Sequence, residues 1–249
     1  MKIIISPAKK MNVIEEFEGT LTKPSLLDET SILCQALKKL TFHQLQALWK
    51  CSQKLAAVNY ERLQNMDLKT NLSPALLAYE GLQYQYMAPQ IFTGSQWEYV
   101  LHNLRILSGF YGVLKPFDGV VPYRLEMQAP LQVGPFSSLY EYWGTSIAKN
   151  ICADDTLILN LASREYSKAV LPHLTSQILC ITCDFKEVSD GRLITKGTLA
   201  KMARGEMIRF LAENRITDPD EIKKFCGLNY TFQPSLSTCE NYVFVRIPD

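Results

Sequence analysis

The chain has 249 residues, of which 47% are hydrophobic, so it can form one large domain with a substantial core. Its 26 basic and 25 acidic residues give a formal net charge of +1, which is not the balance of a protein that coats nucleic acid through excess positive charge. Local clustering of cations remains compatible with this total. No apolar run approaches the roughly 20 residues of a membrane-spanning helix. We therefore expect a cytoplasmic protein with no membrane partner and with its seven cysteines reduced.

The predicted elements alternate between strands and helices along most of the chain. Residues 156–162 form a continuous apolar strand that runs straight into a helix at 163–171, which is the βα unit of a parallel or mixed sheet. We predict a mixed α/β (α+β) fold in which residues 1–249 form a single compact domain, or two intimately packed lobes, with a central mixed sheet and surrounding helices. In chain order the other elements are a strand at 2–6, helices at 26–40, 42–66, from 73 to about 81, at 96–107 and from 138, strands at 177–187 and 192–196, helices at 198–214 and from 218, and a strand at 242–247.

Three glycines and three basic residues distinguish the segment at 101–127, LHNLRILSGFYGVLKPFDGVVPYRLEM. Ser95 and Glu98 form a capping box before it, and Gly109 ends the helix that they open. The pattern predicts a helix, a tight turn between Gly109 and Gly112, and a second short helical turn. Backbone N–H groups at such a turn can point outward and bind a phosphate; the alternative is a turn that only lets two helices pack. The basic residues that would join them are Arg105, Lys115 and Arg124.

Polar residues follow the two apolar strands at 2–6 and 156–162, where loops commonly hold functional groups. Ser163 lies at the predicted start of a helix, so it either faces a phosphate or acts only as the N-cap of that helix. Ser6 follows the first strand and is a second candidate phosphate ligand. The cations in these two loops either face the same anion or lie in solvent; they are Lys9 and Lys10 after the first strand, and Arg164 and Lys168 after the second.

A basic stripe is predicted on the helix at 198–214. Lys201 and Arg204 are three residues apart and share one face, and Gly205 leaves a gap beside them where a backbone or a ligand can approach. A glycine inside a helix lowers helix stability by roughly 1 kcal/mol relative to alanine, so its presence indicates a close contact at this position. The alternative is a helix face that is exposed only to solvent.

The sequence predicts neither a metal site nor a cofactor. Cys180 and Cys183 have the spacing of a metal or redox pair, but residues three apart on a predicted strand point to opposite faces, so we expect them to be structural. The three histidines have no spacing that would complete a metal site. We also find no P-loop, no dinucleotide-binding glycine motif and no serine-hydrolase motif.

Five sequence motifs are spread over nearly the whole chain. They are IISPAKKM at 4–11, LSGFYGVLKPFDGVVPYRLEM at 107–127, LYEYWG at 139–144, LNLASREYSKAV at 159–170 and AKMARGEMIRF at 200–210. The second motif resembles the signature of the YaaA family of bacterial peroxide-stress proteins. The other four are similar to pieces of the same family and occur in the same order.

This resemblance implies a cytoplasmic protein of the response to hydrogen peroxide that limits oxidative damage and binds DNA through a helix–hairpin–helix element and a positively charged cleft. The helix–hairpin–helix would span 96–115, with its turn at 108–112. We expect duplex or branched DNA to be bound without sequence preference. The expected DNA-binding residues, chosen by charge and position, are Lys9, Arg105, Gly109, Gly112, Lys115, Arg124, Arg164, Lys168, Lys201 and Arg204, with Ser6 and Ser163 as phosphate ligands.

The same cleft also allows an enzyme that acts on a phosphorylated small molecule or nucleotide. In that hypothesis Ser163 and the loop at 6–9 bind the phosphate, while Asp118 or Glu126 handles protons. Glu141 and Glu165 are further candidate acids, or they merely complement the starts of helices. The sequence leaves these two functions as alternatives. A third possibility, direct iron sequestration, is supported only by the stress response that the resemblance implies.

Overall fold

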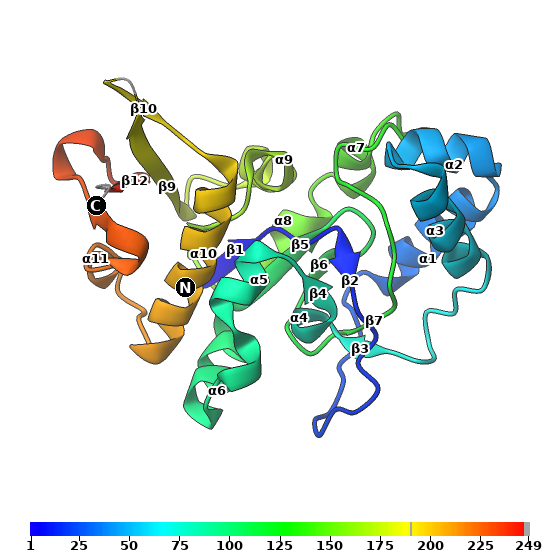
Figure 1. The fold of residues 1–249 in the computed structure, drawn as a ribbon, viewed down its shortest axis with the longest axis horizontal. Coiled ribbons are helices and arrows are strands. Elements are labelled where there is room, and N and C mark those ends of the chain that lie inside the picture. The colour runs from blue at the N-terminus through cyan, green and yellow to red at the C-terminus, as the bar shows by residue number, and fades with distance from the viewer. Residues whose placement is uncertain (190, 247–249) are drawn as a thin grey trace.

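A mixed β-sheet forms the centre of the molecule in the computed structural model, which describes residues 1–189 and 191–246 (Figure 1). Its middle five strands are parallel to their neighbours, and antiparallel strands complete its edges. This arrangement confirms the predicted mixed α/β class. Across the sheet the order is β11 (Tyr230–Phe232), β12 (Asn241–Arg246), β9 (Leu179–Ser189), β8 (Leu157–Asn160), β1 (Lys2–Ile5), β5 (Leu104–Ser108) and β6 (Gly112–Leu114), while β10 (Arg192–Ile194) pairs with the end of β9.

Two short ribbons tie loops to the main sheet. β2 (Lys10–Met11) pairs with β4 (Tyr79–Glu80), and β3 (Ser73–Pro74) pairs with β7 (Gly119–Val120). The first ribbon connects the loop that follows β1 to β4, the strand that directly precedes α5.

Helices cover the sheet and extend beyond it at one end. α1 (Leu27–Lys38), α2 (Phe42–Trp49) and α3 (Gln53–Gln64) form a group far from the C-terminal strands (Figure 1). The helix predicted at 42–66 is interrupted, because Lys50 takes a left-handed conformation and Ser52 caps α3. The remaining α-helices are α4 (Ala75–Ala78), α5 (Leu82–Met87), α6 (Gly94–Asn103), α7 (Leu139–Trp143), α8 (Ser146–Ile151), α9 (Arg164–Ser167), α10 (Gly197–Glu213) and α11 (Pro219–Ile222).

β1 is buried between parallel neighbours on both sides. Ile4 pairs in register with Arg105 of β5 and Asn160 of β8, and the three isoleucines at 3–5 are at most 1% exposed. A strand covered on both faces needs such a continuous apolar run. The chain leaves β1 toward β5 but leaves β8 toward β9, in the opposite direction. The carboxyl ends of β1 and β8 therefore lie at a topological switch point, where open α/β sheets form a ligand-binding crevice.

The segment predicted as a helix–hairpin–helix folds differently, and that prediction is wrong. α6 opens with a capping box between Thr93 and Gln96, not between Ser95 and Glu98, and ends at Asn103. The residues that follow form β5 and β6, an antiparallel hairpin in which every residue is buried. Pairing with β1 and burial in the sheet outweigh the helical spacing of the leucines in this segment.

The backbone donors of the hairpin turn are used inside the protein. The N–H groups of Phe110 and Tyr111 donate to Ser108 Oγ, at 3.1 and 2.9 Å. They therefore do not form the outward-facing phosphate site that the glycine pattern suggested.

Gly109 and Gly112 are required by close packing around the same turn. A Cβ at Gly109 would lie 2.7 Å from the carbonyl oxygen of Leu125. Gly112 has a φ of +70° and would place a Cβ 3.0 Å from the Trp143 ring. Both glycines thus have structural roles.

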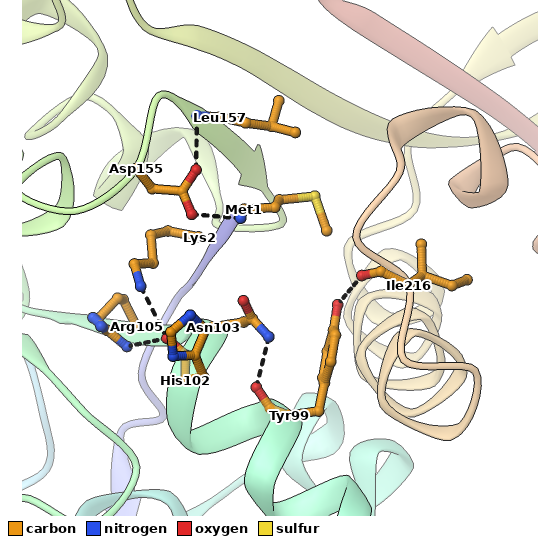
Figure 2. A network of polar contacts seen from close by, with 9 residues as sticks. All are labelled: Met1, Lys2, Tyr99, His102, Asn103, Arg105, Asp155, Leu157 and Ile216. Atoms are coloured by element: carbon orange, nitrogen blue, oxygen red, sulfur yellow. Dashed lines mark hydrogen bonds and ion pairs between the residues drawn. The ribbon is translucent and has the colours of Figure 1, made fainter.

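Arg105 is buried beside the amino-terminal end of β1 (Figure 2). Its guanidinium and the Lys2 ammonium both donate to the carbonyl oxygen of His102, at 3.3 and 3.1 Å. Burial lowers the pKa of Arg105, and burial followed by the charge of Arg105 lowers the pKa of Lys2. Asp155, also in Figure 2, pairs with the amino group of Met1. Arg105 therefore joins the end of α6 to the sheet and does not face an external phosphate.

α10 and α5 touch through their backbones at Gly205. A Cβ at this position would lie 2.2 Å from the carbonyl oxygen of Gln83 and 2.9 Å from the backbone nitrogen of Met87. The gap predicted beside Lys201 and Arg204 is therefore filled by the backbone of α5.

Substitution of Gly205 should destabilise the fold even though alanine is the better helix former. We expect Gly205→Ala to lower the free energy of unfolding by about 1–3 kcal/mol, because the new Cβ must push α5 away from α10. Gly197→Ala, in the same helix with no atom within 4 Å of the added Cβ, should be neutral or slightly stabilising. Urea unfolding measures both. Equal stability of the two variants would contradict the close backbone contact.

Candidate functional site

A cavity of about 380 Å³ lies beyond the carboxyl ends of β1 and β8. The loop after β1 and the start of α9 form two of its walls, as expected at the switch point. The first turn of α5 forms a third wall, held in place by the β2–β4 ribbon and by the contact with α10. The lining consists of residues 6–10, 80–84, 123–126, 163 and 165–166, together with Lys201 and Arg204.

Ser6 and Ser163 form a hydrogen-bonded pair at the base of this cavity. The Ser163 N–H donates to Ser6 Oγ at 2.8 Å, and Ser6 Oγ donates to Ser163 Oγ at 3.1 Å. The Tyr84 hydroxyl donates to the Ser6 carbonyl oxygen at 3.0 Å and fixes the loop from the α5 side. Ser163 makes no side-chain cap bond to α9. Its hydroxyl hydrogen therefore remains able to donate to a ligand in the cavity.

Three buried donors on the cavity walls have no partner in the described part of the protein. They are Nε of Arg124, Nε of Arg204 and Nε2 of Gln83. Burial lowers the pKa of Arg204, which the charge of Asp184 partly offsets. Gln83 is only 6% exposed. Each unsatisfied buried donor costs roughly 1–3 kcal/mol, so three residues that line one void retain unused hydrogen-bonding capacity, which favours a ligand with acceptor atoms.

Two carboxyl groups in the cavity have different surroundings. Glu126 Oε1 lies 2.9 Å from Nζ of Lys9 and 3.8 Å from a guanidinium nitrogen of Arg124. Glu165 Oε1 accepts the backbone N–H of Gln128 at 3.3 Å. Burial, followed by the negative charge of Glu126, raises the pKa of Glu165, while Lys9 and backbone N–H groups act in the opposite direction.

Aromatic side chains close the cavity. Tyr123 donates or accepts hydrogen bonds with the hydroxyls of Ser108 and Tyr79, at 2.6 and 2.7 Å, and burial raises its pKa to about 12. Tyr84 and Tyr166 are also buried, and burial raises the pKa of both. These hydroxyls stay neutral at physiological pH, so the aromatic walls contribute no charge.

The cavity gathers half of the residues predicted for the site. Arg164 and Lys168 lie on the exposed side of α9, where the Lys168 ammonium is 4.9 Å from the centre of the Tyr140 ring. Arg105, Gly109, Gly112 and Lys115 lie elsewhere. The predicted residues that line the cavity are Ser6, Lys9, Arg124, Ser163, Lys201 and Arg204.

The structure changes the assignment of the acids. Asp118 is 1% exposed and accepts hydrogen bonds from the Lys115 N–H at 2.8 Å and the Thr22 hydroxyl at 2.6 Å, so it orders a turn outside the cavity. Of the other candidates, Glu126 and Glu165 line the cavity, and Glu141 bonds to Ser137.

Sequence reasoning missed the α5 wall. Gln83 and Tyr84 belong to no chemical motif, and their position depends on the contact between two helices far apart in the chain. Gly205 was the only indication of this wall in our sequence analysis, because a glycine inside a helix indicates close contact with another segment, which here is α5.

In the described ranges, no three His, Cys, Asp or Glu side chains are grouped so that they could hold a metal ion, and no helix is long and apolar enough to cross a membrane. Cys183 is buried and Cys180 partly exposed, both as free thiols on β9.

The fold and cavity define an α/β protein with a cavity at a switch point of its sheet, lined in part by cationic side chains. The chain belongs to the family described as Peroxide stress protein YaaA, whose model matches residues 1–236. It is 51% identical to a UPF0246 protein of Agathobacter rectalis, over 99% of both chains. Similar relatives are UPF0246 proteins of Desulfitobacterium hafniense, at 50% identity, and of Pediococcus pentosaceus, at 49%, each over 99% of this chain and 98% of the relative.

Replacing Arg204 should stabilise the protein. We expect Arg204→Met to raise the free energy of unfolding by about 1 kcal/mol, because it removes a largely desolvated charge that makes no ion pair among the described residues, while keeping apolar volume. Arg209→Met on the same helix removes only a surface ion pair with Glu213 and should change stability by less than about 0.5 kcal/mol. Denaturant unfolding measures both. A loss of stability in Arg204→Met would make Arg204 a structural residue.

Proposed function

We propose that the protein binds the phosphate group of a nucleotide in this cavity, as part of the peroxide-stress response for which its family is named. One observation carries the proposal: Arg124, Arg204 and Gln83 line one void at the switch point of the sheet, and each has a buried donor with no partner among the described residues. Phosphate oxygens accept several hydrogen bonds at once and carry the charge that two guanidinium groups favour.

Size and charge at the cavity support a phosphorylated small molecule. A volume of about 380 Å³ falls within the roughly 300–1,000 Å³ of small-molecule sites. Lys201 adds an exposed ammonium at the mouth, and Ser163 adds a hydroxyl donor at the base.

The carboxyl and aromatic groups of the cavity suit a sugar and a base better than they suit a second phosphate. Glu126 and Glu165 can accept hydrogen bonds from ribose hydroxyls, as carboxylates do in nucleotide sites. Tyr84 and Tyr166 supply aromatic surface for a heterocycle. Together with the cations they favour a nucleotide over inorganic phosphate.

DNA remains a second candidate, because exposed cations continue from the cavity mouth across its rim. The side chains of Lys9 and Lys10 are 65% and 69% exposed, and Lys201 lies on the same rim. Arg164 and Lys168 are exposed on the neighbouring α9. These five cations could hold backbone phosphates of duplex or branched DNA without sequence preference, with no helix–hairpin–helix involved.

Nucleotide binding is tested by thermal and chemical stability in the presence of nucleoside 5′-monophosphates. A nucleotide at 100 times its Kd should add roughly 2.7 kcal/mol to the free energy of unfolding. Arg204→Met should lose this gain, whereas Arg209→Met should keep it. Absence of stabilisation by any nucleotide at millimolar concentration would refute the proposal.

DNA binding is tested by salt titration with a duplex and a four-way junction. If the five rim cations contact phosphates, the slope of log K against log salt should be about −4, and the double variant Arg164→Ala, Lys168→Ala should make it shallower by about 2. A slope near zero would contradict DNA binding through these cations and would not affect the nucleotide proposal.

A further inference from the structure

We propose that the cavity is catalytic and hydrolyses the glycosidic bond of a nucleoside 5′-monophosphate, with Glu165 as proton donor and Glu126 as base. This inference rests on the proposed nucleotide binding and assigns a reaction to the same site.

The two carboxyl groups come from separate segments and meet in the cavity. Glu126 belongs to the loop after β7, and Glu165 to α9, yet Glu165 Oε1 accepts the N–H of Gln128, two residues beyond Glu126. Both line the same void as Arg124 and Arg204. A substrate whose phosphate is held by these two guanidinium groups therefore presents the rest of its structure to both carboxyl groups.

The two carboxyl groups have different neighbours. Glu126 faces the ammonium of Lys9 at 2.9 Å and the guanidinium of Arg124 at 3.8 Å. Glu165 is half-buried and makes no ion pair among the described residues. Burial, followed by the charge of Glu126, raises the pKa of Glu165. Acid–base catalysis at a glycosidic carbon uses one carboxyl group as proton donor and a second as base, and these surroundings favour Glu165 for the first role and Glu126 for the second.

The groups that face Glu165 come from four segments, the loops after β1 and β7 and the helices α7 and α9. The negative charge of Glu126 and the neutral hydroxyls of Tyr140 and Tyr166 favour its protonated form or leave it unchanged. Lys9 and the backbone N–H of Gln128 favour the ionised form. Burial is the largest influence, and it favours the acid.

The residues that line the cavity are less suited to nucleophilic catalysis or to attack at phosphorus. Among the described residues, no histidine or cysteine lines the cavity. The two serines are hydrogen-bonded to each other, and no described base lies next to them that would turn either into a nucleophile. Carboxylates beside a phosphorus atom would also repel an attacking anion. A glycosidic carbon, which gains positive charge in the transition state, is instead stabilised by carboxylates.

The step balances with water as the only co-reactant. Glu126 accepts a proton from water, and the water oxygen forms a bond to C1′ as the bond between C1′ and the base nitrogen breaks. The electron pair of that bond goes to the base, which takes its proton from Glu165. The products are ribose 5-phosphate and the free base; the proton gained by Glu126 then restores Glu165 through solvent.

The experiment follows release of free base from adenosine, guanosine, cytidine and uridine 5′-monophosphates by chromatography. We expect release from at least one of them. The corresponding nucleosides should react at least 100-fold more slowly, because they lack the phosphate that positions the substrate. Glu165→Gln and Glu126→Gln should each lower the rate 100-fold or more while nucleotide binding, measured by thermal shift, is retained. Glu141→Gln, outside the cavity, should keep the wild-type rate.

The pH profile separates a proton donor from a structural residue. Glu165 acts in its protonated form, so the rate should fall as pH rises through its raised pKa, and this limb should disappear in Glu165→Gln. Nucleotide binding without base release, or full activity of Glu165→Gln, would overturn this inference and leave the proposed function intact. Absence of nucleotide binding would overturn both.

Discussion

The parallel pairing of β1 on both of its edges is the constraint on which the rest of the site depends. Because Ile4 is in register with both Arg105 and Asn160, the chain segments that follow β1 and β8 leave the sheet side by side. The hydrogen bond between the Ser163 N–H and Ser6 Oγ joins residues 157 positions apart in the chain. No local motif could produce this pair; the register of two buried strands does. The sheet therefore fixes the positions of the loops that line the cavity, as it does at switch points generally.

The cavity walls retain unsatisfied groups that a purely structural core would have removed. Helix α10 meets α5 backbone to backbone at Gly205, and this contact places Gln83 and Arg204 on one wall. Both side chains keep a buried donor without a partner. Proteins tolerate such local costs at functional sites when the surrounding fold is stable enough to impose them, and here the apolar strand β1 lies directly behind. The location of the unsatisfied donors is therefore evidence about function, in a way that exposed lysines are not.

Much of the sheet could be predicted from the sequence, because its central strands are short continuous apolar runs. The isoleucines at 3–5 and the run at 156–162 identify β1 and β8, and Ser6 and Ser163 follow from their ends. The segment at 104–115 could not be predicted. Its leucines fit a helical period and a strand equally well, and only pairing with β1 decides between them.

Cavity residues could be predicted from the sequence only where they lie at the end of a predicted strand or on one face of a predicted helix. Lys9, Arg124, Lys201 and Arg204 were expected to share a cleft, and all four line the cavity. Arg105 was grouped with them on charge alone, although a single arginine in a buried strand can equally satisfy helix-end carbonyls, as Arg105 does. Gln83 was missed because neither burial nor lack of a partner can be read from one amide in a sequence.

The near-neutral charge of the chain bears on which ligand the site can favour. A net charge of +1 provides little long-range attraction, and DNA affinity depends on many phosphate contacts made together. At the cavity mouth Lys9 and Lys10 are already paired with Glu126 and Glu80, which reduces the charge available to a polymer. The donors of Arg124 and Arg204 are buried, where low dielectric strengthens each contact and salt screens it less. Short-range recognition by a few desolvated groups suits one phosphate that enters the cavity better than a row of phosphates passing over it.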